Sequence, residues 1–531
     1  MGIRSESRVR LCRVLLLGTT AGVVASAIQA QELGQDDALE LDPIIVKSRD
    51  FYGSSADRAT SMYVSDLELE RARTGDLKDV FAGIASVSVG GAIPVAQKIY
   101  VNGVDMLNLG VSIDGAAQNN RAFHHVSANA IDPGLLKQVR ADATVSPADA
   151  GPYALAGSVV FETIDPEDVV PIGETLGGNV RLSYGDNGGT AQGALTLAGR
   201  HGGFSWLGYV KRATGDDYES GDGETIKGTA ADLISYLGKV AYESRSGNRY
   251  EFSAQQVTDS ELRQYRANFG GVGGVVDSLR LYDTRRASYS FIYENVLAEG
   301  MWDPKVTIGY SESDIRVPSP YDSNGLSGTW SATVQNTFNL SARDTIVAGV
   351  DFQSRFGEYS SPTYAERYEE NSRIYGIFAQ ARLEPTDRIK LSFGSRFDYQ
   401  EFEGVDGSSQ SNSGFSGNFS AVYALTDSFS LRGGISSVFG GIDIEDNYTY
   451  LPSWSYSDLQ AARAKNATFG FDWNLGQLNL GGELFLTQID NARGGVSNFD
   501  FESRGFNLGA TYGWATGFAR LTLSHSDIEV D

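Results

Sequence analysis

The chain is poor in the residues that crosslink proteins or bind metals. Its 531 residues include one cysteine, Cys12, and only four histidines. Cys12 lies in an N-terminal segment that we expect to be removed, so disulfides and thiolate chemistry should play no part in the mature protein. The histidines are His124, His125, His201 and His525, and no hydrolase, zinc-protease or phosphate-loop motif accompanies them. The sequence therefore predicts neither an enzyme nor catalytic residues.

Long apolar runs and an excess of basic residues are also missing. No run of 18 or more apolar residues follows the N-terminus, and the mean hydropathy is −0.23, which argues against helical membrane spans. The 43 basic and 67 acidic residues give a net charge of −24, whereas nucleic-acid binding needs a basic surface. The chain is instead rich in glycine, with 62, and in tyrosine and phenylalanine, with 26 each, which suits many strands and turns.

The N-terminus has the three parts of a secretory signal. Arg4, Arg8, Arg10 and Arg13 form a basic region, residues 14–27 are apolar and small, and Ala27 or Ala30 offers a cleavage point. The alternative, a short membrane anchor, is disfavoured because the apolar run is too short to span a bilayer comfortably. We therefore predict a cleaved signal peptide in residues 1–30.

Short apolar-alternating runs separated by turn dipeptides occupy residues 97–163. They read QKIYVNGVD at 97–105, VSIDGA at 111–116, IDPGLLKQV at 131–139 and AGPYALAGSVVFET at 150–163. Asn-Gly, Asp-Gly and Gly-Pro mark tight turns, so the pattern predicts a small mixed sheet. This region resembles the plug domain of TonB-dependent outer-membrane receptors, most of all the branch for ferric siderophores of the enterobactin type and, in some members, haem. The resemblance implies a plug at residues 50–170, whose residues 66–81 we expect to be helical and divided by Gly75.

A short β-prone segment precedes the plug within a flexible, acidic N-terminus at residues 31–49. An extended segment of this kind can add to the edge of a partner's sheet through main-chain hydrogen bonds. In the resembled family this is the TonB box, on which the inner-membrane TonB–ExbB–ExbD complex pulls. The alternative is the first strand of the plug. The predicted box is Leu41, Asp42, Pro43, Ile44, Ile45, Val46, Lys47 and Ser48.

From about residue 171 the apolar pattern takes a period of two over runs of about ten residues. Ile389, Leu391 and Phe393 share one face, for example, while Lys390 and Ser392 take the other. Such alternation between tight turns is typical of a transmembrane β-barrel with a wet interior. A soluble β-sandwich is the alternative, which the signal peptide and the strand length disfavour. We therefore predict an all-β protein of the bacterial outer membrane, a large antiparallel barrel at residues 171–531 in contact with lipid, with the α+β plug in its lumen.

The barrel pattern contains about 17 strands, whereas the resembled family has 22. Long loops are predicted at residues 215–231, 262–283, 316–326, 355–371, 401–413 and 440–464. The chain ends on Glu-Val-Asp rather than on the aromatic residue usual in the family, which indicates a truncated sequence or missing final strands. From these features we predict an incompletely closed, C-shaped wall.

Two stretches carry side chains suited to a ligand. The first follows the Asp114-Gly115 turn and comprises Asn119, Asn120, Arg121, Phe123, His124 and His125; in resembled plugs it is an apical loop. Arg121 suits an anionic chelate, Phe123 suits a flat ring, and His124 and His125 are candidate ligands of iron or haem. Alternatively these residues only bind the plug to the wall. The second is an aromatic cluster of Tyr448, Tyr450, Trp454 and Tyr456, which either grips a flat ligand or stiffens a loop.

Together these features predict a TonB-dependent receptor that imports a ferric siderophore. A haem receptor of the same architecture is the nearest alternative, and a passive porin or an adhesin barrel is more remote because neither needs a plug or a box. The ferric chelate or haem would be the transported ligand, and the pattern predicts no resident cofactor.

Overall fold

A computed structural model describes residues 61–64, 66–122, 126, 130–267, 279–320, 322–514 and 517–531. The predicted signal peptide and TonB box lie outside the described residues, as do Phe123, His124 and His125. In the part of the chain that is described, no helix has the length and apolar character needed to cross a membrane.

Residues 61–170 form a small α+β unit, the plug, whose strands make two sheets. A five-stranded sheet has the order β1-β7-β8-β5-β6, in which only β5 and β8 are parallel, and a three-stranded sheet has the order β2-β3-β4. The elements are β1 (Ser61–Tyr63), α1 (Asp66–Ala72), α2 (Leu77–Phe81), β2 (Val87–Gly90), η2 (Pro94–Ala96), β3 (Lys98–Val101), β4 (Val104–Asp105), η3 (Met106–Asn108), β5 (Gly110–Ile113), β6 (Ala116–Gln118), η4 (Pro133–Leu135), β7 (Leu136–Ala143), η5 (Ala148–Ala150), β8 (Gly157–Thr163) and α3 (Pro166–Val169).

The turn dipeptides of the plug act as the sequence predicts. The two-residue turn between β5 and β6 has positive φ at both central residues, 47° at Asp114 and 76° at Gly115, the conformation for which Asp-Gly is selected. The predicted break at Gly75 is also confirmed, because α2 begins afresh beyond it. Asp76 caps α2 by accepting a hydrogen bond from the backbone N–H of Lys78 at 2.8 Å.

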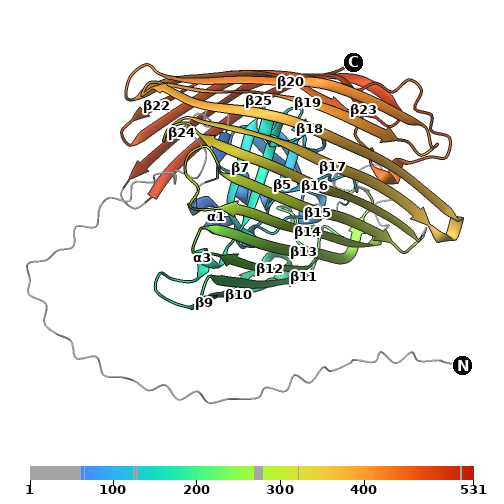
Figure 1. The fold of residues 1–531 in the computed structure, drawn as a ribbon. Coiled ribbons are helices and arrows are strands. Elements are labelled where there is room, and N and C mark those ends of the chain that lie inside the picture. The colour runs from blue at the N-terminus through green and yellow to red at the C-terminus, as the bar shows by residue number, and fades with distance from the viewer. Residues whose placement is uncertain are drawn as a thin grey trace, which may run out of the picture. The chain divides into compact units, whose positions relative to one another are not determined.

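Seventeen antiparallel strands form the wall around the plug, which confirms the predicted strand number. They are β9 (Leu176–Gly185), β10 (Thr190–His201), β11 (Phe204–Gly215), β12 (Ala231–Glu243), β13 (Asn248–Gln264), β14 (Leu279–Asn295), β15 (Pro304–Val317), β16 (Ser323–Asn339), β17 (Thr345–Ser361), β18 (Glu366–Thr386), β19 (Ile389–Glu403), β20 (Ser409–Ala424), β21 (Phe429–Gly441), β22 (Ala462–Leu475), β23 (Leu478–Gly494), β24 (Ser497–Trp514) and β25 (Gly517–Val530). Figure 1 shows the plug strands β5 and β7 behind the wall strands β14 to β17.

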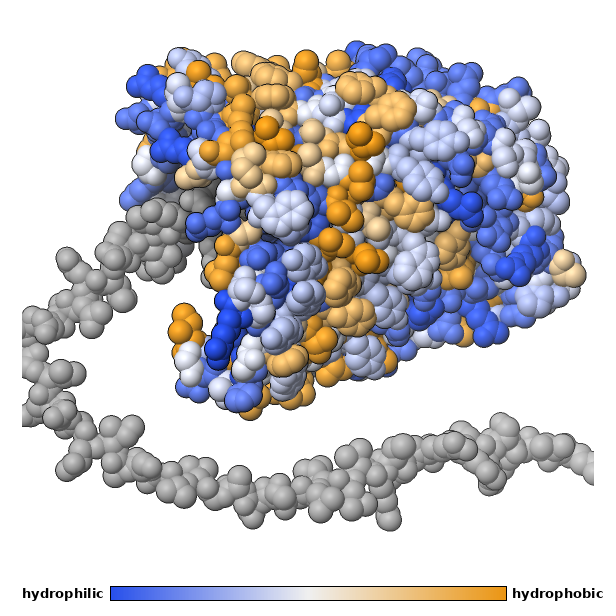
Figure 2. All heavy atoms as spheres, viewed as in Figure 1, coloured by the Kyte–Doolittle hydropathy of each residue, from blue (hydrophilic) through white to orange (hydrophobic). Residues whose placement is uncertain are grey.

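The two faces of the wall differ as expected for a barrel in lipid. Large apolar side chains such as Val350, Ile377 and Leu484 are exposed on the outer face. Their sequence neighbours on the inner face, such as Asp351 and Gln353, are buried against the plug. Figure 2 shows apolar and aromatic residues spread along the outside of the wall, with hydrophilic residues gathered at the end on the right of the view.

Three of the predicted long loops are wrong. Residues 316–326, 355–371 and 401–413 belong mostly to paired strands joined by short turns. β18 has 21 residues and spans about 70 Å, far more than the apolar band of about 25 Å. Beyond the lipid a strand can be polar on both faces, so it stays paired while the alternation that marks it in the sequence disappears.

The predicted C-shaped wall stays a prediction. The strand order places β25 next to β9, but β9 pairs residue by residue with β10 and β25 with β24, and no ladder of partners joins β9 to β25 among the described strands. Because sixteen antiparallel steps separate the two strands, β9 and β25 run in the same direction. Among the described wall strands they are the two in which no residue is buried, and ion pairs join each of them to plug helix α1, Arg181 of β9 to Glu70 and Arg520 of β25 to Glu68.

Candidate functional site

The end of the plug at Asn119–Arg121 is fastened to the wall by side-chain hydrogen bonds. Asn119 Nδ2 donates to the carbonyl oxygen of Gly328 on β16 at 2.9 Å, and Asn119 Oδ1 accepts from Ser327. Asn120 is buried with a positive φ of 54°, which turns the chain inward. Asn119 therefore binds plug to wall in this structure, and the same turn directs Arg121 towards the barrel interior.

The connection between β21 and β22, residues 442–461, folds inward over Arg121; we call it the inner loop. Ile442, Ile444 and Tyr456 are each at most 2% exposed, so this loop is part of the interior rather than a surface loop. The backbone N–H of Asn447 donates to the carbonyl oxygen of Arg121 at 3.3 Å. The side-chain amide of Asn447 donates to carbonyl oxygens on β16 and β17 at 3.0 Å each, which fixes the loop in place.

Arg121 is one of three buried arginines that meet the carboxylates of this loop. Arg121 Nη2 lies 3.2 Å from Asp443 Oδ2 and Nη1 lies 3.6 Å from Glu445 Oε1. Arg355 of β17 binds the same Asp443 oxygen at 2.7 Å. Arg493 of β23 lies 4.0 Å from Glu445. Burial alone would lower the pKa of Arg121, but Asp443 and Glu445 raise it above its usual value, so the guanidinium stays charged.

A third carboxylate, Glu370 of β18, completes the cluster. Arg493 Nη2 binds Glu370 Oε1 at 2.6 Å, and the Tyr456 hydroxyl donates to the same oxygen at 2.6 Å. Three guanidinium groups and three carboxylates are thus enclosed together with no net formal charge, an arrangement that a buried ionic cluster requires. We call these six residues, Arg121, Arg355, Arg493, Glu370, Asp443 and Glu445, the arginine–carboxylate cluster.

The predicted aromatic cluster is only partly brought together. Trp454 packs edge-on against Tyr450 and Tyr456, with ring centroids 5.6 Å and 6.2 Å apart, whereas Tyr448 packs against Tyr359 of β17 at 5.4 Å. The Tyr448 hydroxyl donates to the carbonyl oxygen of Ile315 at 2.7 Å. Burial, with a further contribution from Glu370, raises the pKa of Tyr450 well above its usual value. In this conformation the rings stiffen the inner loop, and contact with a ligand stays a prediction.

A polar cavity of about 560 Å³ separates the plug from wall strands β15–β18. This volume falls within the range of roughly 300–1,000 Å³ typical of small-molecule sites. Arg355 lines the cavity and also belongs to the arginine–carboxylate cluster, so the two regions are continuous. Hydroxyl groups from both sides, such as Ser112 and Ser158 on the plug and Thr333 on the wall, make its surface hydrophilic.

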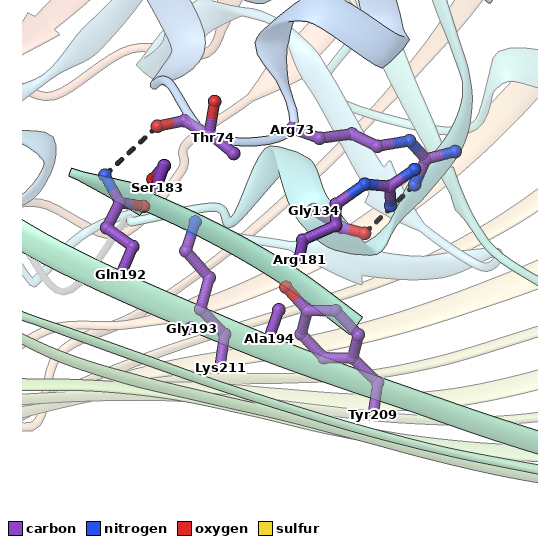
Figure 3. A pocket seen from close by; sticks show the side chains of 10 residues that line it. All are labelled: Arg73, Thr74, Gly134, Arg181, Ser183, Gln192, Gly193, Ala194, Tyr209 and Lys211. Atoms are coloured by element: carbon purple, nitrogen blue, oxygen red, sulfur yellow. Dashed lines mark hydrogen bonds between the residues drawn. The ribbon is translucent and has the colours of Figure 1, made fainter. Parts of the chain in front are cut away.

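A second pocket, between α1 and β9–β11, is too small for a ligand. Its volume of about 10 Å³ matches one water molecule. Figure 3 shows Arg73 donating to the carbonyl oxygen of Gly134 and Gln192 donating to that of Thr74, at 3.2 Å and 3.1 Å. The first bond lies within the plug and the second joins β10 of the wall to the plug. This pocket is therefore part of the contact between plug and wall.

No group of three or more His, Cys, Asp or Glu side chains is placed to hold a metal ion among the residues that the structure describes. The candidate metal ligands His124 and His125 fall outside that range. The structure therefore leaves their role as a prediction.

The comparisons with known proteins decide the family. Residues 54–158 match the TonB-dependent receptor plug domain, and residues 183–530 match the TonB-dependent receptor-like β-barrel. The chain belongs to the TonB-dependent receptors. Members of this family are outer-membrane transport proteins and not enzymes, as the sequence predicts.

Several relatives of this receptor have been characterised or solved. Haem transporter BhuA of Brucella ovis is 30% identical over 95% of this chain and 79% of its own length. TonB-dependent haem receptor A of Haemophilus ducreyi is 21% identical over 87% of this chain and 76% of its own. The FrpB iron transporter of Neisseria meningitidis has the same fold, with a TM-score of 0.79 and 18% identity over 89% of this chain and 80% of its own.

Sequence reasoning missed most of the arginine–carboxylate cluster. Arg355 shares the inner face of β17 with Asp351 and Gln353, so its alternation marks it as a residue of the lumen. That signal does not separate it from other charged lumen residues. Asp443 and Glu445 carry no signal in a segment that reads as a surface loop, because only the folded inner loop brings them to Arg121.

Proposed function

We propose that this receptor imports haem, and that the ligand first binds where the plug meets the inner loop. The observation that carries the proposal is the similarity to haem transporter BhuA over 95% of the chain. It favours the haem alternative over the ferric siderophore that the sequence pattern alone led us to prefer. The charged and aromatic groups at this end of the plug suit haem, which has a flat ring, a metal centre and two carboxylates.

The remaining parts of the transport cycle follow from the family. Residues 1–30 direct export and are cleaved, and residues 41–48 are the TonB box that the TonB–ExbB–ExbD complex engages. We assign residues 31–49 to the flexible N-terminus, 50–170 to the plug and 171–531 to the barrel, in contact with lipid. Asn119, Asn120, Arg121, Phe123, His124 and His125, with Tyr448, Tyr450, Trp454 and Tyr456, are the proposed ligand-binding residues.

Growth on haem tests the function directly. A Gram-negative strain that can neither synthesise haem nor import it should grow on haem when it expresses this chain, and should stop growing when TonB is removed. The same strain should gain no uptake of ferric enterobactin. Uptake of iron from ferric enterobactin without growth on haem would restore the siderophore alternative.

The ligand residues are tested by binding to the purified receptor. Combined His124→Ala and His125→Ala should weaken haem binding and change the absorption band of the bound iron, because imidazole ligation is lost. Arg121→Ala and Phe123→Ala should each weaken haem binding without that spectral change. Unchanged affinity in all of these variants would place the site elsewhere in the barrel.

A further inference from the structure

The residues of the arginine–carboxylate cluster stand on two kinds of segment, the plug and wall strands on one side and a connecting loop on the other. The three arginines stand on the plug and on the wall strands β17 and β23, whereas Asp443 and Glu445 stand on the inner loop. Both carboxylates that contact Arg121 therefore come from a segment that only connects two strands. The third carboxylate, Glu370, is fixed on β18 and binds Arg493.

Arg121 and Arg355 are held by contacts that do not involve the loop. Arg121 Nη2 donates to the carbonyl oxygen of Leu107 in the plug at 3.2 Å. Arg355 donates to Gln353 Oε1 at 3.3 Å, and its guanidinium carbon lies 3.8 Å from the centre of the Tyr153 ring. The two cations would therefore keep their positions if the loop moved away.

An anion beside a buried guanidinium stabilises it strongly. The side chains of Arg121 and Arg355 are only 7% and 4% exposed, and removing the partner of such a buried ion is strongly unfavourable. Arg121 Nε is buried without any hydrogen-bond partner, so this arginine has an N–H group that the loop does not use. Any group that displaces Asp443 and Glu445 must itself bring negative charge.

We propose that Asp443 and Glu445 occupy a binding site for the carboxylates of the transported ligand, and that the ligand displaces them from Arg121 and Arg355. The inference rests on the proposed haem function, since haem carries two carboxylates on one edge. Planar carboxylates match the guanidinium fork in charge and geometry. Because Arg355 also lines the cavity of about 560 Å³ and binds Asp443, the exchange takes place where that cavity meets the inner loop.

The test compares haem with its dimethyl ester, which has the same ring and iron but no free carboxylate. Absorbance titrations use the full receptor in detergent. The unmodified receptor should bind haem at least tenfold more tightly than the ester. Asp443→Asn combined with Glu445→Gln should tighten haem binding at least tenfold and leave ester binding unchanged, because the internal competitor is gone. Arg121→Gln with Arg355→Gln should reduce haem affinity to that of the ester.

A control variant separates this exchange from a general effect of loop charge. Asp458 lies exposed on the same inner loop, and Asp458→Asn should leave both affinities unchanged. If the double carboxylate variant fails to fold, Glu445→Gln alone removes the longer 3.6 Å contact with Arg121 and should give a smaller gain for haem only.

Loop movement gives a second measurement. The only cysteine is Cys12, in the predicted signal peptide, so a spin label on Asp458→Cys would be unique in the mature chain. Haem should mobilise this label and the ester should not. Equal affinities for haem and ester, or equal label mobility with both, would overturn the exchange while leaving haem transport intact. Failure of both compounds to bind would overturn the proposed function and this inference with it.

Discussion

Asp132→Asn should loosen the plug from the wall. The Asp132 carboxylate is fully buried and accepts hydrogen bonds from Lys211 Nζ, from the Tyr209 hydroxyl and from the backbone N–H of Gly134, each at 2.9 Å. Lys211 and Tyr209 belong to β11, so one plug side chain is tied to the wall by two bonds. The substitution leaves the Lys211 ammonium, only 7% exposed, without a counter-charge.

The expected cost follows from the geometry of this pair. Two unit charges 2.9 Å apart attract by about 6 kcal/mol at an effective dielectric constant of about 20. Asparagine costs less to bury than a carboxylate, which offsets part of the lost attraction. Removing one partner of a buried ion pair typically costs about 3–5 kcal/mol in net stability. A loss of about 3 kcal/mol multiplies the population of the loosened plug by on the order of 10².

Hydrogen exchange of the plug amides in β7 and β8 measures that population in the detergent-solubilised receptor. Asp132→Asn should accelerate their exchange on the order of 10²-fold. Adding Lys211→Met should restore much of the protection, because no unpaired charge then remains. The exposed pair Arg343–Asp387 is the matched control, and Asp387→Asn should change nothing. Unaltered exchange in Asp132→Asn, or a double variant as fast as the single one, would refute this reasoning.

Three further predictions concern other parts of the chain. Ile45→Pro removes a main-chain donor from the proposed TonB box, so it should abolish haem uptake but not haem binding; normal uptake would contradict the assignment. Burial alone would raise the pKa of Asp165, but Lys239 and Lys137 lower it to about 2. This carboxylate therefore stabilises the folded plug by about 2 kcal/mol above its unfolded pKa of about 3.9 and loses that effect as the pH falls towards 2. Plug-amide protection, corrected for intrinsic exchange, should fall over this range and fall less in Asp165→Asn. Gly115→Val places a Cβ atom 2.7 Å from a β15 side chain at a φ of 76°, so it should cost at least about 1–2 kcal/mol, seen as a lower melting temperature in detergent.

The architecture could be predicted from the sequence because it depends on local patterns, namely strand alternation and turn dipeptides. Strand alternation has a period of two because successive side chains face lipid and lumen, so the barrel and its seventeen strands could be read directly. Asn-Gly and Asp-Gly turns have few alternative conformations, so the plug hairpins could be read as well. Where the strands leave the lipid, the alternation ends while the pairing continues, and there the predicted loops at 316–326, 355–371 and 401–413 are wrong.

Only the tertiary structure decided how distant residues meet. The first and last wall strands meet the plug through Arg181–Glu70 and Arg520–Glu68, and no pattern in the sequence pairs these residues. Arg121 could be predicted as a residue that binds anions, but not that Asp443 and Glu445, more than three hundred residues away, would occupy it. A charged side chain shows in the sequence that it needs a partner, whereas the identity of that partner depends on which segments the fold brings together.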